Sequence, residues 1–299
     1  MMNLDHSFPP PPSAGQSSVE LLKRAIETYC ASFGFCIRLY RFPIIAFFIG
    51  LVPFSLFDHK AVSLNDYIQL GSAEVWFFVC AFISAYSMAF RTLALQRMVL
   101  SPGMDFVCAM AYANRFGKRG FYASLVVLIL QGSLIFPFLF PGFSTWQSKP
   151  GLGLPFGVPA ALLALACIIL VPCLNYLLHC FRFSLATTEG SWTTNLNRAM
   201  TFVKAGFARG FGLEVLMCCV CSCLYWLLSP ETYYYLPQIG KIGLTGVLFP
   251  HYPPAFMAVT DGLVTCLMDF VTFPVCAIWG AYFVNDVRLQ MADSGSKNI

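Results

Sequence analysis

The stretch RFGKRGFYASLVVLILQGSLIFPFLF (Arg115–Phe140) joins a basic cluster to a long uncharged run. Arg115, Lys118 and Arg119 come first, and no charged residue follows between Phe121 and Phe140. A helix of about 20 apolar residues is long enough to cross the hydrocarbon core of a bilayer. Basic residues beside such a span mark its cytoplasmic end. The stretch therefore predicts a transmembrane helix that begins inside the cell.

The same arrangement extends along the chain in both directions. Apolar windows lie at about 42–57, 75–92, 121–140, 158–178, 211–228 and 262–284. All but three of the 18 Lys and Arg residues precede the first window, follow the sixth, or lie between the second and third or the fourth and fifth. The exceptions are Lys60, Lys149 and Lys241. This sorting predicts an all-α membrane protein with six transmembrane helices and both termini in the cytoplasm.

The composition supports a membrane environment. Hydrophobic residues make up 58% of the chain and charged residues 11%, against about 25% charged in soluble domains. The net charge of +4 gathers on one face, where it favours anionic lipid headgroups. No basic block with interleaved aromatic residues indicates nucleic-acid binding. We expect a disordered Pro-rich cytoplasmic tail over 1–18, a membrane domain over 19–288, and a second cytoplasmic tail over 289–299.

An amphipathic pattern recurs before the odd-numbered windows. Apolar residues at helical spacing form one set, with a copy 174 residues later and a fainter third copy. The three sets are Leu22, Ile26, Tyr29 and Phe33; Leu196, Met200, Val203 and Phe207; and Phe106, Met110 and Ala113. They predict inner-face amphipathic helices in a three-fold repeat of two-span units. The alternative is that any apolar helix beside an inner loop needs such residues.

The stretch FRFSLATTEGSWTTNLNRAMTFVKAGFARGFGLEVL (Phe181–Leu216) resembles a segment of a bacterial membrane family. That family comprises the membrane domain of glycerophosphoryl diester phosphodiesterases and its YciC-like stand-alone relatives. The ending AYFVNDVRLQMADSG is similar to the family's terminal Tyr-Tyr-Asp-Leu-Arg-x-Arg, and departs from it at Asn285 and Gln290. The resemblance implies a multi-pass helical domain in the bacterial cytoplasmic (inner) membrane. It carries over no catalytic residue.

Asp269 is the sharpest candidate for chemistry, because an ionisable residue inside a span is costly and is a functional-site hypothesis by default. Asp261 shares its helical face, and Pro274 follows one turn later. Asp269 either couples a proton or cation or hydrogen-bonds a neighbouring span, with Gln131 as one expected partner. Glu214 is expected to pair with Arg38, Arg41 or Arg209. His179 is expected to be an interfacial residue.

No catalytic motif, metal site or cofactor is predicted, and the Cys218–Cys223 cluster is interpreted as packing. Arg24, Arg198, Lys204 and Arg209 are expected to contact lipid headgroups or membrane-protein partners at the inner face. The leading hypothesis is a non-enzymatic scaffold or assembly factor in membrane homeostasis. The alternative is a small transporter that uses Asp269 for proton or cation coupling, and a lipid-handling enzyme is a weaker third.

Overall fold

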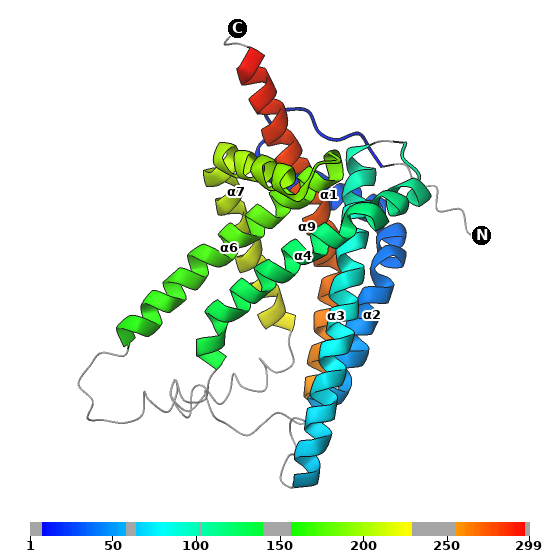
Figure 1. The fold of residues 1–299 in the computed structure, drawn as a ribbon, viewed down its shortest axis with the longest axis vertical. Coiled ribbons are helices and arrows are strands. Elements are labelled where there is room, and N and C mark those ends of the chain that lie inside the picture. The colour runs from blue at the N-terminus through cyan, green and yellow to red at the C-terminus, as the bar shows by residue number, and fades with distance from the viewer. Residues whose placement is uncertain (1–7, 58–63, 102, 140–156, 229–254, 297–299) are drawn as a thin grey trace.

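The computed structural model describes the chain except for residues 1–7, 58–63, 102, 140–156, 229–254 and 297–299 (Figure 1). Throughout these described residues, every regular element is an α-helix. The helices are α1 (Ser18–Ala31), α2 (Phe33–Phe57), α3 (Leu64–Leu100), α4 (Phe106–Leu139), α6 (Gly157–Thr187), α7 (Trp192–Leu228) and α9 (Ala255–Ser296). The all-α prediction is confirmed for this part of the chain.

Within the same residues, five helices are long and apolar enough to cross a membrane, which is compatible with a multi-pass membrane protein. The segments are Phe33–Pro53, Val75–Leu100, Ile169–Thr187, Trp192–Leu224 and Gly262–Asp293. They include five of the six apolar windows in whole or in part. The remaining window, 121–140, falls in α4 and runs past its last described residue. A sixth span therefore stays a prediction.

The helices are longer than the apolar windows because charge does not by itself end a helix. Arg91 and Arg97 lie inside α3, and α9 continues through Pro274 to Ser296, so most of the expected 289–299 tail is helical. In α7 the amphipathic and apolar halves form one element, bent at Gly206, whose φ and ψ of −114° and 15° are non-helical. Long basic side chains can reach from such positions toward the interface.

The tightly packed core lies toward one end of the bundle. Figure 1 shows α2, α3 and α9 running side by side, while α4 and α6 diverge from them away from this end. The large side chains that are fully buried come from the ends of the helices that meet here, and they include Tyr40, Leu93, Tyr176, Phe183, Trp279 and Tyr282. The first described residues and the end of α9 lie at the same end.

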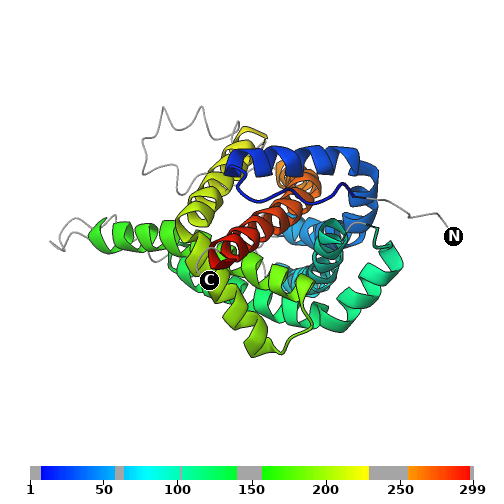
Figure 2. The same ribbon diagram turned by 90° about the horizontal axis from the view of Figure 1, so that it is seen from above.

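Three amphipathic segments surround α9 at this end, as the view from above shows (Figure 2). They are α1, the first half of α4 (residues 106–122) and the first half of α7 (residues 192–210). Together these three segments are called the collar. The collar helices begin alike, since the side chains of Ser17, Asp105 and Ser191 each accept a hydrogen bond from the backbone N–H three residues on. Such N-caps satisfy N–H groups that a helix start leaves unpaired. The predicted repeat is not established by this similarity.

α1 packs on α9 through a face that only partly overlaps the apolar stripe its pattern suggested, and Tyr29 is common to both. Its buried residues are Leu21, Ala25, Thr28 and Tyr29. Ile26 and Phe33, from the expected apolar stripe, are 45% and 49% exposed. Ser32 ends α1, so Phe33 already belongs to α2. Ala25 at the buried face lets the two helices approach closely, and Leu21 and Tyr29 are buried beside it.

A proline in α9 helps to dock α1. Pro274 has no N–H, so the carbonyl of Phe270, four residues earlier, loses its helical donor. The Tyr29 hydroxyl donates to this carbonyl at 3.0 Å. Burial raises the pKa of Tyr29 to about 12, so the hydroxyl keeps its proton at neutral pH. The preceding residue, Thr28, shares a hydrogen bond of 3.1 Å with Tyr282, further along α9.

We predict that Tyr29→Phe lowers the free energy of unfolding by about 1–3 kcal/mol, because a partly buried carbonyl loses its donor. In a Pro274→Ala background the N–H of residue 274 can donate to the Phe270 carbonyl in place of Tyr29. Tyr29→Phe should then lower the free energy of unfolding by at least about 0.5 kcal/mol less than it does in the unaltered protein. The four proteins are compared by denaturation in mixed micelles. Equal costs in both backgrounds would show that Tyr29 does not compensate for the proline.

Candidate functional site: polar contacts at the collar

The segment before α1 is packed against the protein. Phe8 is 5% exposed and its ring meets that of Phe35 edge-on at 5.7 Å. Gly15 has a φ of +85°, which favours glycine, and its N–H donates to Asp286 Oδ1 at 2.7 Å. Residues 8–17 therefore differ from the expected disordered tail. Residues 1–7 lie outside the described chain.

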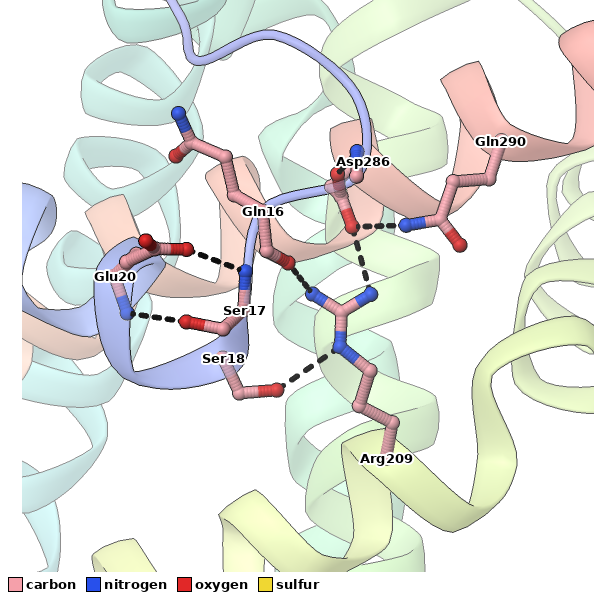
Figure 3. A network of polar contacts seen from close by, with 8 residues as sticks. Gln16, Ser17, Ser18, Glu20, Arg209, Asp286 and Gln290 are labelled. Carbon is pink, nitrogen blue, oxygen red and sulfur yellow. Dashed lines mark hydrogen bonds and ion pairs between the residues drawn. The ribbon is translucent and has the colours of Figure 1, made fainter.

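Arg209 and Asp286 form the centre of the contacts at this end (Figure 3). Arg209 Nη1 lies 2.8 Å from Asp286 Oδ2, and the carboxylate is fully buried. The other two nitrogens of the guanidinium donate to the Ser18 hydroxyl at 2.9 Å and the Gln16 carbonyl at 2.5 Å. The pair therefore joins α7, α9 and the start of α1.

The buried Asp286 carboxylate also accepts hydrogen bonds from two further donors. Gln290 Nε2 donates to Oδ2 at 2.7 Å, and the Gly15 N–H donates to Oδ1. The Arg209 guanidinium also lies 5.1 Å from the centroid of the Phe283 ring, a favourable cation–π position. Charge-assisted hydrogen bonds of this kind are stronger than neutral ones. No local sequence pattern relates Arg209 to Asp286, since the two residues lie on different helices, α7 and α9.

A capping box continues this network into α1. The Ser17 N–H donates to Glu20 Oε2 at 2.8 Å, and the Glu20 N–H donates to the Ser17 hydroxyl at 3.3 Å. These hydrogen bonds lower the pKa of the Glu20 carboxyl. The box therefore weakens only in acid, as Glu20 protonates below its ordinary range.

Of the four predicted inner-face contact residues, two are exposed and two are half-buried. Arg198 and Lys204 are exposed on the first half of α7. Arg24 is half-buried within electrostatic range of Tyr282. Arg209 directs its hydrogen bonds into the protein and its side chain is 30% exposed. These hydrogen bonds hold the collar together, and the lipid or partner contact expected for Arg209 stays a prediction.

A second group of contacts fixes the connection between α6 and α7. Arg97 donates to the Ala186 carbonyl at 2.6 Å and lies 4.6 Å from the Tyr112 ring centroid. Tyr112 donates to the Leu185 carbonyl at 2.5 Å, and Arg119 donates to the Gly190 carbonyl. Side chains of α3 and α4 thus bind carbonyls that the end of α6 leaves unpaired.

The side chain of Asn195 forms hydrogen bonds inside this connection. Its side-chain oxygen accepts from the Ser184 hydroxyl at 2.8 Å, and its amide donates to the carbonyls of Gly190 and Ser191 at 3.1 and 3.0 Å. Asn195 is fully buried. The stretch Phe181–Leu216 thus contains a connection whose polar groups are met mostly by its own residues and by arginines from neighbouring helices.

The intramembrane residues chosen from the sequence are not brought together. Asp269 is half-buried in α9 and forms no hydrogen bond or ion pair with the described part of the chain. Gln131, its expected partner, instead donates to Asn175 Oδ1 at 2.8 Å. Asp261 lies in α9, and its side chain is outside the described structure. A polar track from Asp261 to Asp269 stays a prediction.

Sequence reasoning missed a pair of ionisable residues in α6 and α7. His179 Nε2 lies 3.3 Å from Glu214 Oε1, and the two side chains are 13% and 6% exposed. Glu214 was expected to pair with an arginine, and His179 to lie at the interface. The histidine is one turn from Arg182 on α6, but nothing local in the sequence relates either residue to α7. No set of three or more His, Cys, Asp or Glu residues in the described chain could hold a metal ion.

We predict that Asp286→Asn destabilises the protein by about 1.5–3 kcal/mol, since charge-assisted hydrogen bonds are lost while Arg209 stays partly buried. Arg115→Gln is the control, because the Arg115–Glu189 pair at 3.3 Å is 69% and 55% exposed and such pairs contribute about 0–1 kcal/mol. Denaturation in mixed micelles measures both. Similar losses for the two variants would contradict a special role for Asp286.

Comparisons with protein-family models, with curated proteins and with solved structures found no match. The family resemblance of Phe181–Leu216 therefore stays a prediction. The contacts of this stretch are nevertheless specific enough to assign structural roles to Asn195 and Arg209.

Proposed function

We propose that this chain is a non-enzymatic integral membrane protein whose collar forms a fixed platform in the lipid interface. It would act as a scaffold or assembly factor in membrane homeostasis, in the bacterial cytoplasmic membrane with both termini inside. One observation carries the proposal: the collar helices are bonded to the bundle on one face and expose apolar and basic side chains on another.

The first half of α7 supports this most directly. Asn195 and Ala199 are fully buried against the bundle. Met200 and Phe207 are 41% and 45% exposed, and Lys204 is exposed on the same segment. Large apolar side chains exposed beside basic residues suit a helix lying at the headgroup boundary. Each basic residue near anionic headgroups contributes about 1 kcal/mol of attraction.

The other collar segments have a similar division. In α1 the buried residues Leu21 and Ala25 face the bundle, while Val19 is 70% and Ile26 is 45% exposed. In α4 Ala109 is fully buried and Val107 is 73% exposed. Networks centred on Arg209 and Arg97 restrain these segments. A restrained platform suits the binding of other membrane proteins better than a site that must open and close.

A small transporter is the second candidate, and the placement of Asp269 favours it. This carboxyl group lies inside the candidate span Gly262–Asp293 without a partner among the described residues. An unpaired carboxyl group at such a position is a natural proton or cation ligand. Asp269 alone does not define a route for a proton or cation to either side of the membrane. We therefore place transport second.

We predict that a photo-reactive benzophenone side chain gives lipid adducts when it replaces Ile26 or Phe207, because both positions lie on the exposed apolar faces of the collar. Glu27 and Arg198 are the matched positions on the polar faces of the same helices. At Arg198 we expect discrete protein adducts after irradiation of whole cells. Mass spectrometry of the purified adducts identifies both products.

Asp269→Asn separates the two candidates. If the chain is a scaffold, this substitution should leave the adducts unchanged. Lipid adducts of equal yield at all four positions would contradict an oriented collar. Absence of any protein adduct at Arg198, together with solute uptake into vesicles that Asp269→Asn abolishes, would favour the transporter.

A further inference from the structure

His179 and Glu214 bring two ionisable side chains together inside the membrane domain. They lie within the candidate spans Ile169–Thr187 and Trp192–Leu224. The 3.3 Å contact joins imidazole Nε2 to a carboxylate oxygen, with little of either side chain exposed. Nothing in the proposed scaffold requires this pair. Ionisable groups are retained at such positions mainly where they have a function.

The pair is not saturated with hydrogen bonds. Glu214 Oε1 and His179 Nδ1 are both buried and have no hydrogen-bond partner among the described residues. Arg182 Nε and Trp279 Nε1 are in the same condition, and the Trp279 ring lies edge-on to the imidazole at 5.9 Å. Buried polar groups are nearly always paired, so an unpaired group calls for an explanation.

The surroundings leave little room for a ligand with volume. A methyl group added at Gly280 would come within 2.6 Å of His179 Nδ1, so the ring is already against the backbone of α9. A metal ion or a water molecule needs space and several ligands. A proton needs neither.

Several other groups act on this pair from the helices packed around it. Arg182 is the nearby positive charge, and its Nη2 donates to the Ser124 hydroxyl of α4 at 2.8 Å. The remaining ionisable groups in electrostatic range of Glu214 are Tyr176 and Cys180 on α6, Cys218 and Cys221 on α7, and Cys276 on α9. Tyr40 of α2 acts on Arg182, and Arg91 of α3 acts on Tyr40.

We propose that His179 and Glu214 form a proton-binding site within the membrane domain. With Glu214 as carboxylate and His179 neutral, the Arg182 charge offsets that of the carboxylate. The site then takes one proton from water. The product is an imidazolium–carboxylate pair or, after transfer from Nε2 to Oε1, a neutral imidazole and a carboxylic acid. Release returns the same proton to water.

Binding of this proton changes the contact between His179 on α6 and Glu214 on α7. A neutral ring with its hydrogen on Nε2 can donate to the carboxylate across this contact. Binding of the additional proton makes that hydrogen bond charge-assisted. Protonation therefore strengthens the contact between the two helices. The site belongs to the pair, so its proton is not assigned to either residue alone.

Infrared difference spectroscopy of the full chain in lipid nanodiscs tests this site between about pH 5 and 8, the range in which histidine ordinarily titrates. We expect bands from a Glu carboxyl group and an imidazole ring to change together. Labelling the unaltered protein with ¹³C-glutamate should shift the carboxyl band, while ¹³C-aspartate should not. This measurement does not depend on the folding of a variant.

Two substitutions complete the test. Glu214→Gln should remove the carboxyl band and reduce the accompanying imidazole change, and Asp269→Asn should leave both. The proposal is overturned if only aspartate labelling moves the band, since the exchanging group is then Asp269. It is also overturned if no carboxyl band changes with pH, which would make His179–Glu214 a static contact. Neither result bears on lipid or partner cross-linking at the collar.

Discussion

The buried ion pair between Arg209 and Asp286 is the interaction on which the arrangement of this end depends. Its two residues come from α7 and α9, and its remaining hydrogen bonds reach the segment before α1. Removing two charges from water costs several kcal/mol per ion, and the cost is offset only with good geometry and further hydrogen bonds. Here Gly15, Gln16, Ser18 and Gln290 supply those bonds. The pair is thus stable only where all three segments are in place.

The two ends of the bundle consequently have different properties. At the collar, arginine side chains bind carbonyls at the end of α6, and large aromatic residues fill the space between the helices. Farther along, α4 and α6 diverge and expose apolar residues such as Leu128 and Ile169, which are 60% and 43% exposed. Such surfaces suit lipid, because hydrocarbon replaces the protein contacts that a soluble core would make. The polar interactions are therefore concentrated where the helices converge.

The sequence predicted features that arise from local pattern. Apolar windows indicated the helices, and periodicity placed amphipathic segments at 22–33 and 196–207. The N-cap positions Ser17, Asp105 and Ser191 could also have been found, since each precedes an amphipathic run. The side of α1 that is buried could not, because small residues such as Ala25 face α9 and no pattern within α1 identifies the partner. Glu214 was assigned to an arginine because charge alone suggests that partner. Its actual neighbour, His179, depends on how α6 packs against α7.

The docking of α1 also limits the order in which the molecule can be completed. The first helix and the segment before it leave the ribosome early, yet three of their hydrogen-bonding partners, Phe270, Tyr282 and Asp286, lie on the last helix, α9. Until α9 has been synthesised and placed, the Tyr29 hydroxyl and the N–H of Gly15 lack these acceptors. The N-terminal segment therefore reaches its final position only after α9 has been synthesised. A chain truncated before α9 lacks these three partners and keeps only the contacts of its N-terminal segment with α2 and α7.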